Sequence, residues 1–581
     1  MTRCSTLTLL AAIAASFVTA FATAQATRMP SPLVPTFSPR EATVGTAVEL
    51  DLVLLDEARA HPKVQFTGFP LGNGETVTLD LEPFDVLAPG AQLVAADGAN
   101  QTPLAIPDVL LMRGTVLGEP GSRVFLALSP YGSQGFLQAR GTTFVVADTE
   151  LNAGTTFVYD IRDAATIPTL GPGDSPRCGG PILSPELAAP APNTGSSAES
   201  FDDRSVCRTL RLAIETDWEY FNHPAFAGNR NAAAAYAVTL LGAVSEIYRT
   251  DINVSFNITF LRIWTTDSDP FVNTSTVDTR LYELRAAWMG VSQSAVPRQL
   301  VHLLSGHRDG SGGIAYLGAL CSTNLGYAVS GYLNASFPYP LVNKNWGNWD
   351  VNVVAHELGH NFGAIHTHEM NPRIDGCGIG DCSVAWSGTI MSYCHTCSGG
   401  MSNIILTLGY RVIYERIVPY LNTLGTRCIL DNASAGVFTA QPAGGLFRLN
   451  RPVTLSAATT AGTSMRYHWR RGVTWLSDDA TYSGTTTPTL RINRLTNTEL
   501  GEYTLFVSSA CAGVSSSPAL VRATCEADFN RDGLIDTTDF VAFVDAFNQF
   551  LSTDGDFNRD SVTDNADFLI FVAAYNRLVC P

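Results

Sequence analysis

The segment HELGHNFGAIH occupies residues 356–366. In an α-helix, positions i and i+4 lie on one face, so His356 and His360 can direct two imidazoles at one metal ion. Gly363 can adopt a positive φ and end the helix, which lets the chain turn back so that His366 supplies a third nitrogen. Three protein ligands leave the fourth position of a tetrahedral zinc ion open, as is typical of catalytic sites. The spacing therefore predicts a catalytic Zn²⁺ site.

Glu357 is the candidate catalytic residue, because it lies next to His356 and can reach a water bound to the metal. Zinc lowers the pKa of such a water to about 7 and polarises a carbonyl group. A carboxylate can take the water proton and deliver it to the leaving amine. A helix with solvated histidines is the alternative interpretation. Five of the ten histidines lie between residues 356 and 395, which favours the metal site.

A methionine follows the histidines at a suitable distance, since GTIMSYCH places Met391 25 residues after His366. The histidine pattern with this methionine resembles the metzincin clan of zinc metallopeptidases, and within it the reprolysin (adamalysin) family. The resemblance implies an α/β (α+β) catalytic domain in which Met391 forms a hydrophobic floor beneath the ligands. GIAYLGALC at 313–321 resembles the family's edge strand, which pairs with an extended substrate. Residues 114–146 resemble its propeptide.

Two positions depart from the reprolysin pattern. Thr367 follows the third histidine, where reprolysins usually carry Asp. Tyr393 is more similar to the corresponding residue of astacins and serralysins, which can approach the metal. Tyr393 is therefore a candidate helper of the oxyanion or metal, and an aromatic residue packed beneath the site is the alternative. We expect His368 and His395 to lie at the surface or behind the metal ligands.

Length and charge limit the possible functions. A chain of 581 residues is too long for one core. Its formal net charge of −17, without a cluster of Lys and Arg, disfavours nucleic acid or an anionic membrane surface as the main partner. The first 24 residues combine an apolar run with a small-x-small cleavage pattern. We therefore expect a secreted protein, extracellular or cell-surface associated, without a stable membrane span.

The predicted architecture is multidomain, with the α/β metzincin domain flanked by a β-rich propeptide, a β-sandwich and a small helical calcium-loop module. Residues 436–523 resemble an immunoglobulin-like domain, with Trp469 in the core and Tyr503 as the tyrosine corner, although the usual two cysteines are absent. The predicted boundaries are 1–24 for the signal peptide, 25–165 for an all-β propeptide, 166–205 for a linker, 206–432 for the metzincin domain, 436–523 for the immunoglobulin-like domain and 525–580 for a dockerin-like repeat pair.

Cys178 is a candidate latch. The segment SPRCGGP at 175–181 resembles the cysteine switch of matrix metalloprotease propeptides. A thiolate at this position would fill the fourth zinc position and keep the enzyme latent until the linker is cut. An ordinary disulfide, for example with Cys207, is the alternative.

The other cysteines are expected to form disulfides in an exported chain. Cys321 and Cys428 are one candidate pair, which would join the edge strand to the last helix of the domain. For the pair at 394–397, half of a structural zinc site or a redox centre is the alternative. The cluster after the zinc helix consists of Cys377, Cys382, Cys394 and Cys397.

The C-terminal residues contain a repeat, in which DFNRDGLIDTTDF recurs as DFNRDSVTDNADF. Oxygen-bearing side chains occupy positions 1, 3, 5, 9 and 12 of each twelve-residue loop, a spacing that can surround Ca²⁺. The pair resembles a type I dockerin module, which implies tethering to a cohesin-like partner or a cell-surface anchor. An acidic helical tail is the alternative. The candidate calcium ligands are Asp528, Asn530, Asp532, Asp536, Asp539, Asp556, Asn558, Asp560, Asp564 and Asp567.

The predicted function is that of a secreted zinc metalloendopeptidase, made as a latent zymogen. It would hydrolyse peptide bonds in protein or peptide substrates by attack of a zinc-bound water activated by Glu357. One alternative is an extracellular adhesion or scaffold protein with an inactive protease-like domain, but the base and all three ligands are present. The other is a zinc hydrolase acting on non-peptide bonds, against which the edge strand argues.

Overall fold

A computed structural model describes most of the chain between Ala26 and Asn576. The predicted signal peptide and the linker with Cys178 lie outside the described residues. The described residues are 26–36, 45–72, 74–119, 122–140, 142–148, 156–160, 208–272, 276–290, 295–308, 312–335, 349–424, 431–432, 438–460, 466–472, 474–476, 478–508, 513–524, 527–530, 534–549, 555–558 and 560–576.

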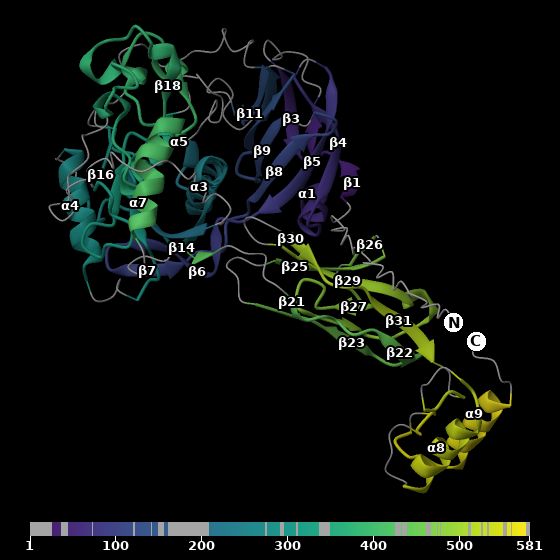
Figure 1. Ribbon diagram of the computed structural model, residues 1–581. Helices are drawn as coiled ribbons and strands as arrows, with labels where there is room; N and C mark the ends of the chain where they lie inside the picture. The colour runs from purple at the N-terminus through teal and green to yellow at the C-terminus, as the bar shows by residue number, and fades with distance from the viewer. Residues whose placement is uncertain are drawn as a thin grey trace, which may run out of the picture.

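A mostly parallel sheet forms the centre of the predicted metallopeptidase domain (Figure 1). In spatial order its strands are β16 (Gly313–Ala315), β17 (Tyr327–Ser330), β15 (Leu300–Leu304), β13 (Arg208–Thr216), β14 (Val254–Trp264), β6 (Leu87–Asp97) and β7 (Asn100–Pro103), and β20 (Asp431–Asn432) also pairs with β13. The β13, β14, β15 and β17 pairings are parallel, whereas β16 runs antiparallel to β17 at the edge. The predicted α/β layering is confirmed. Of the edge strand predicted at 313–321, residues 313–315 form β16.

Helices cover both faces of this sheet. They are α3 (Arg230–Ile252), α4 (Val277–Trp288) and α5 (Trp349–Asn361). Successive side chains of a strand point to opposite faces. Accordingly, Leu212 and Ile214 of β13 join the apolar cluster that contains α3 and α5, while Ala213 joins the cluster that contains α4. Burial on both faces is the usual state of a parallel sheet.

Short elements complete this part of the chain, and several of them support the end of α5. They are α2 (Trp218–Phe221), η3 (Pro224–Phe226), η5 (Thr367–Glu369), η6 (Cys377–Ile379), η7 (Ala385–Ser387), β18 (Gly388–Thr389), η8 (Cys394–Thr396), η9 (Gly400–Asn403), β19 (Ile404–Ile405), α6 (Tyr410–Val412), the π-helical η10 (Ile413–Ile417) and α7 (Val418–Thr423).

The N-terminal region forms a second sheet. Its described strands, in spatial order, are β1 (Thr27–Pro30), β4 (Val64–Pro70), β5 (Thr76–Phe84), β8 (Leu110–Val116), β9 (Arg123–Leu128), β10 (Gln134–Ala139), β11 (Thr142–Asp148), β12 (Thr156–Asp160), β3 (Thr46–Leu50) and β2 (Leu33–Pro35). The predicted β-rich character of this region is confirmed, but the stricter expectation of an all-β region is wrong at α1 (Leu52–Arg59). Asp51 starts this helix, since its side chain accepts hydrogen bonds from the backbone N–H groups of Val53 and Leu54.

A β-sandwich follows the metallopeptidase region. Its largest sheet contains β22 (Gly445–Arg448), β31 (Ala519–Thr524), β29 (Gly501–Ser508), β25 (Arg466–Arg471), β26 (Thr474–Trp475) and β30 (Gly513–Ser515). A three-stranded sheet contains β23 (Val453–Ser456), β28 (Thr489–Ile492) and β27 (Tyr482–Ser483). The remaining elements are the paired strands β21 (Phe438–Ala440) and β24 (Ala458–Thr459) and the turn η12 (Asn497–Glu499). Trp469 is fully buried, and the Tyr503 hydroxyl donates to the Glu499 carbonyl at 2.6 Å. The immunoglobulin-like assignment stays a prediction.

The last described part of the chain holds α8 (Thr537–Asn548) and α9 (Asn565–Tyr575), at the far end of the molecule in Figure 1. The rings of Phe543 and Phe571 stack with centroids 4.2 Å apart and join the two helices. The guanidinium of Arg448, on β22, lies 5.1 Å and 5.0 Å from the ring centroids of Phe529 and Phe557. This cation–π contact links the sandwich to both loops.

Among the described residues, no helix combines the length and the apolar character that crossing a membrane requires.

Candidate metal centre

The helix α5 carries the first two predicted ligands and is anchored at its start. The Asp350 carboxylate accepts hydrogen bonds from the Tyr236 hydroxyl on α3 at 2.6 Å and from the Asn334 backbone N–H at 2.9 Å. Burial raises the pKa of Asp350 to about 6, against the effect of these hydrogen bonds. The Tyr248 hydroxyl on α3 donates to the Ala355 carbonyl at 2.8 Å. α3 therefore fixes the position of the helix that precedes His356.

The three predicted histidine ligands converge. The Nε2 atoms of His356 and His360 are 3.1 Å apart, and those of His360 and His366 are 3.2 Å apart. A tetrahedral zinc ion with Zn–N distances of about 2.0–2.1 Å would hold neighbouring nitrogens about 3.3 Å apart. The observed spacing therefore fits one zinc ion held by all three residues.

Each of these rings is held through its second nitrogen. The acceptors are the Ile390 carbonyl for His356 Nδ1 at 2.7 Å, the Ala364 carbonyl for His360 Nδ1 at 2.8 Å and a carboxylate oxygen of Glu369 for His366 Nδ1 at 3.2 Å. Since an acceptor requires Nδ1–H, each neutral ring presents a lone pair at Nε2. Lone pairs at such short separations repel one another unless a cation lies between them. The donor set fits a metal ion for this reason.

The electrostatics of the site favour the metal-binding form of the rings. Burial lowers the pKa of His356 well below its ordinary value, and His360 and His366 lower it further. Burial, reinforced by His366, lowers the pKa of His360 to about 3. Neutral imidazole is the form that ligates metals. These two ligands are therefore neutral throughout the physiological pH range.

Glu357 lies against the edge strand. It is fully buried, and a Cβ atom added to Gly313 of β16 would lie 2.5 Å from its Oε1 atom and 2.7 Å from its Cγ atom. The carboxylate thus occupies space that any residue other than glycine would fill at this point of the strand. The candidate base and the candidate substrate-binding strand are therefore in direct contact.

Met391 lies beneath the metal-binding helix, as predicted for the hydrophobic floor. It is fully buried, and a Cβ atom on Gly359 would lie 2.5 Å from its Sδ atom. The Met391 carbonyl accepts hydrogen bonds from Thr367 N at 3.0 Å and from Thr367 Oγ1 at 3.4 Å. Thr367, which departs from the reprolysin pattern, therefore ties the residue after His366 to this turn.

Tyr393 packs among the histidines. Its ring centroid is 4.5 Å from that of His366, 6.2 Å from that of His356 and 5.2 Å from that of His368. This position suits both a helper at the metal and a packing aromatic, so the two interpretations of Tyr393 stay open.

His368 and His395 lie behind the ligands. The ring of His368 stacks on that of His366 with centroids 5.2 Å apart and an interplanar angle of 8°. His395 is buried, with its ring centroid 5.6 Å from that of Trp349. Of the two expected locations, His395 therefore has the one behind the ligands, because the turn after Met391 folds under the start of α5.

Two disulfides brace the segment after the third ligand, namely Cys377–Cys394 and Cys382–Cys397. The interpretation of residues 394–397 as a redox pair or a structural zinc half-site is wrong, because each of these cysteines is bonded to another. Cys321 is also disulfide-bonded. The Cys377–Cys394 bridge ties the residue after Tyr393 to the segment that follows His366.

The second candidate calcium loop brings its acidic groups together. Carboxylate oxygens of Asp556, Asp560 and Asp567 lie within 4.8 Å of one another. Asp567 accepts hydrogen bonds from the backbone N–H groups of Asn558 at 2.9 Å and Asp564 at 3.0 Å, and the Asp564 side chain caps α9. Positions 1, 5 and 12 of this loop therefore converge.

The first candidate calcium loop has the same pattern at its end. Asp539 accepts hydrogen bonds from the backbone N–H groups of Asn530 at 3.0 Å and Asp536 at 2.9 Å. Asp528 is buried, and Asp532 lies outside the described residues. In the second loop, Ser561 adopts a φ of 74°, in the left-handed region where its side chain costs about 1–2 kcal/mol.

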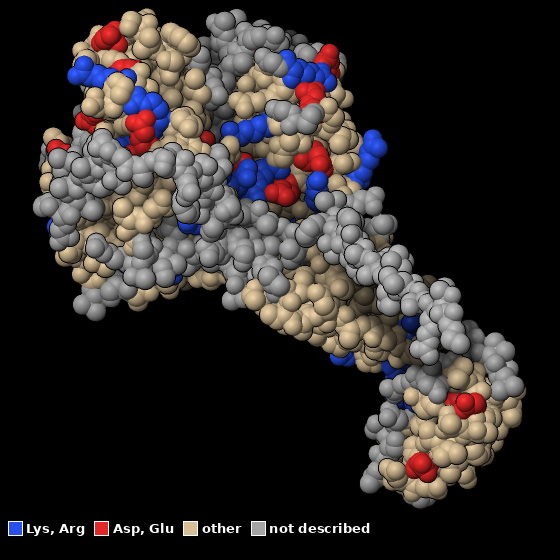
Figure 2. Space-filling model, viewed as in Figure 1, with Lys and Arg blue, Asp and Glu red and all other residues tan. Residues whose placement is uncertain are grey.

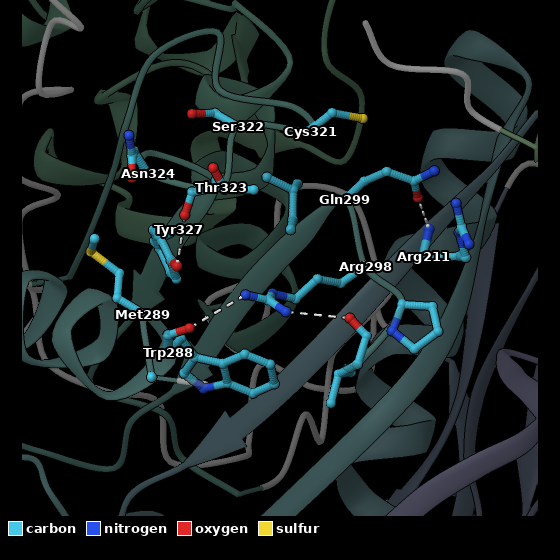
Figure 3. Close-up of a pocket in the computed structure, with 15 residues that line it drawn as sticks. Arg211, Trp288, Met289, Arg298, Gln299, Cys321, Ser322, Thr323, Asn324 and Tyr327 are labelled. Atoms are coloured by element: carbon cyan, nitrogen blue, oxygen red, sulfur yellow. Dashed lines mark hydrogen bonds between the residues drawn. The ribbon is translucent and has the colours of Figure 1, made fainter. Parts of the chain in front are cut away.

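A separate cavity of about 500 Å³ lies near the beginnings of β13 and β15 (Figure 3). The Arg298 guanidinium lies 4.7 Å from the Trp288 ring centroid and donates to the carbonyls of Val296 at 3.3 Å and Trp288 at 3.4 Å. None of the three histidine ligands is among the described residues that line it. The cavity is thus distinct from the metal centre, and the Arg298 side chain is engaged within its wall.

Comparison with known proteins identifies the region that carries the site. The model of a reprolysin-type family, described as metallo-peptidase family M12, matches residues 206–404. Residues 206–404 form a reprolysin-like metallopeptidase domain. A relative, the disintegrin and metalloproteinase domain-containing protein B of Aspergillus fumigatus, is 29% identical over 153 residues, which cover 24% of this chain and 18% of that protein. The chain thus spans about a fifth of that relative's length.

Solved structures match a smaller share of the chain. Extracellular domains 3–5 of Drosophila OTK are 16% identical with a TM-score of 0.15, covering 16% of this chain and 37% of that chain. Tandem Ig repeats of Dlar are 15% identical with a TM-score of 0.14, covering 16% of this chain and 50% of that chain. TM-scores this low support no conclusion about this chain.

Two supporting residues of the metallopeptidase domain were not found by sequence analysis. Glu369 holds His366, and Asp350 holds the start of α5. An acidic residue three positions after the last ligand was the available signal for Glu369. For Asp350, the available signal was only that acidic residues are favoured in the first turn of a helix. Neither signal identifies the partner, which depends on how the chain folds back.

We predict that Glu369→Ala lowers the zinc affinity of the metallopeptidase domain by about 10–100-fold, because His366 loses the acceptor that orients its ring. Glu369→Gln should keep most of the affinity, since the amide oxygen can still accept from Nδ1–H. The measurement is competition with a zinc chelator, with Asp381→Asn, an exposed carboxylate elsewhere in the same segment, as the control. Unchanged affinity in Glu369→Ala would show that this contact does not support the ligand.

Proposed function

We propose that this protein is a secreted zinc-dependent metalloendopeptidase that hydrolyses peptide bonds in proteins. The observation that carries the proposal is the convergence of three imidazole Nε2 atoms at 3.1 and 3.2 Å. The candidate base, Glu357, follows His356 directly in α5 and packs against Gly313 of the edge strand. The match of residues 206–404 to a metallopeptidase family supports the same chemistry. Secretion is proposed from the sequence of residues 1–24 alone.

His356, His360 and His366 would hold the zinc ion. When bound, zinc acts as a Lewis acid on the scissile carbonyl and lowers the pKa of a water molecule. Glu357 takes a proton from the attacking water and passes it to the nitrogen of the leaving amine. Because Glu357 is buried against β16, its carboxylate is desolvated and confined to one side of the site. Tyr393 is the proposed helper of the developing oxyanion.

β16 is the proposed substrate-binding strand. It is the terminal strand of its sheet among the described residues, and its antiparallel pairing to β17 uses only one of its two edges. An extended peptide could add to the other edge through backbone hydrogen bonds, which give affinity without demanding a particular sequence. The contact between Gly313 and Glu357 would then bring the scissile bond close to the base. This geometry favours a peptide over a non-peptide substrate.

We predict that Glu357→Gln lowers cleavage of an unfolded protein by at least about 100-fold, since the amide cannot act as a base. Zinc content, measured by metal analysis, should stay the same because the histidines are intact. The matched control is Glu415→Gln, at a partly exposed residue paired with Arg411, which should cleave normally. Cleavage that persists in Glu357→Gln would contradict the assigned base. Zinc-loaded wild-type protein that cleaves nothing would favour the adhesion or scaffold interpretation.

We further propose that the enzyme is made as a zymogen, with the Cys178 thiolate as the fourth ligand of the zinc ion. Cys178 lies outside the described residues. The proposal is based on the motif around it and on the affinity of zinc for thiolate. A cut between this cysteine and the metallopeptidase domain would release the latch.

We predict that Cys178→Ala makes the uncut protein active, because the fourth metal position is no longer filled by sulfur. The measurement is peptide cleavage by uncut Cys178→Ala, compared with uncut wild-type protein. Pro176→Ala, beside the proposed latch, is the control and should stay latent. Equal latency of Cys178→Ala and wild type would refute the latch.

We also propose that the C-terminal loops bind Ca²⁺ and that the module after the immunoglobulin-like domain tethers the enzyme to a cohesin-like partner or cell-surface anchor. The convergence of Asp556, Asp560 and Asp567 supports calcium binding, because carboxylates held this close repel one another without a cation. The tether is proposed from the dockerin resemblance alone.

We predict that calcium titration of the full chain gives a calorimetric signal that is lost in Asp528→Ala combined with Asp556→Ala, since both loops lose their first ligand. Asp545→Ala, which removes an exposed carboxylate from α8 outside the loops, should titrate like wild type. An unchanged signal in the double variant would assign calcium to another part of the chain.

A further inference from the structure

The N-terminal region does not stay apart from the metallopeptidase domain. β6 lies between β5 and β8 in the sequence but is not a strand of the N-terminal sheet. It pairs in parallel with β14, with Leu93 opposite Leu261 and Val94 opposite Arg262. β7 then adds to β6 as an antiparallel strand. Figure 1 shows β6 and β7 beside β14, on the opposite side of the sheet from β16. The described sheet of the metallopeptidase domain is therefore completed by residues far outside the 206–404 match.

The end of this strand is fixed by further hydrogen bonds. The Thr265 backbone N–H donates to the Ala96 carbonyl at 2.9 Å, and the Thr266 hydroxyl donates to the Asp97 carboxylate at 2.9 Å. The Gly98 backbone N–H donates to the Ser268 hydroxyl at 2.7 Å. Without β6, the backbone groups of β14 on this side would lose their partners, which leaves an edge prone to unwanted pairing.

The apolar core is also continuous across the boundary. Phe84, Leu93, Leu111 and Phe125 of the N-terminal region belong to the same buried cluster as α3 and α5. A Cβ atom added to Gly242 in α3 would lie 2.8 Å from Leu111 Cδ1, so the helix lies directly on the N-terminal sheet. Removing the N-terminal region would expose the apolar side of the helix that positions α5, and exposure of apolar surface to water is unfavourable.

Charged residues also form contacts between the N-terminal region and α3. The Arg113 side chain, only 8% exposed as a residue, lies 2.9 Å from Glu82 and 3.7 Å from Glu246 on α3. Arg123 donates to the Thr250 hydroxyl on α3 at 3.2 Å. Figure 2 shows basic and acidic side chains side by side on this part of the surface. Separation would leave Glu246 without one of its buried cationic partners, which is costly.

We propose that residues 26–160 are a permanent, non-covalently held part of the metallopeptidase unit rather than a detachable propeptide. A cut in the chain between the two parts leaves both fragments in one complex, joined by β6 and by the core around α3. This association rests on the strand pairing and the shared core, and it does not depend on the proposed zymogen.

The test uses the full chain with the recognition sequence of a site-specific protease inserted between residues 161 and 207. After complete cutting, the protein is diluted to about 1 µM, well below the Kd range of weak complexes, and its mass is measured by analytical ultracentrifugation. One species with the mass of both fragments is expected. A free N-terminal fragment beside a metallopeptidase fragment that keeps its zinc would overturn the proposal. The readout is mass, so it is independent of whether the protein cleaves peptides.

A variant tests the strand pairing itself. Val94→Pro removes a backbone donor from β6 and should weaken the association of the cut fragments by at least about tenfold. The matched control is Ile106→Pro, in an exposed segment between β7 and β8, which should associate like wild type. Equal association of Val94→Pro and wild type would contradict the role of β6. If Val94→Pro does not fold, Arg113→Ala replaces it, and faster dissociation of its cut fragments is the expected result; an unchanged rate overturns the proposal.

Discussion

Three imidazole nitrogens that direct their lone pairs at one point repel one another, and they stay together only if each ring is fixed from behind. Here the Nδ1 atoms of the three ligands are committed to two backbone carbonyls and to Glu369. The carbonyl acceptors come from the chain that follows α5, so the metal centre depends on how that chain folds back. A bound cation would attract all three lone pairs in place of this repulsion, and its binding would therefore stabilise the folded domain.

The rest of the domain holds α5, and the chain that follows it, in position. Asp350 and Tyr248 connect α5 to α3, and the Asn361 amide donates to the carbonyls of Tyr316 and Tyr327 on the edge-strand side. Met391 closes the site from below against Gly359. α3 itself is covered by the N-terminal sheet, so the position of the metal centre depends on residues that lie well before the metallopeptidase domain in the sequence, such as Leu111 and Phe125.

Sequence patterns were informative where a local spacing determines the geometry. The i, i+4 histidines, the turn at Gly363 and the alternation of strands with helices between residues 208 and 361 are all local, and the structure has them. The partners of Glu369 and Asp350 were not predictable, because they depend on contacts between distant segments. The pairing of β6 with β14 was missed for the same reason, since a strand pattern does not say which sheet the strand joins.

The central claim is that His356, His360 and His366 bind one zinc ion through Nε2. X-ray absorption at the zinc edge of the purified protein tests it most directly, because it reports the metal and its neighbouring atoms without requiring catalysis. The account predicts one zinc ion per chain with three imidazole nitrogens at about 2.0–2.1 Å. Absence of zinc, or a spectrum without three imidazoles, would contradict the account.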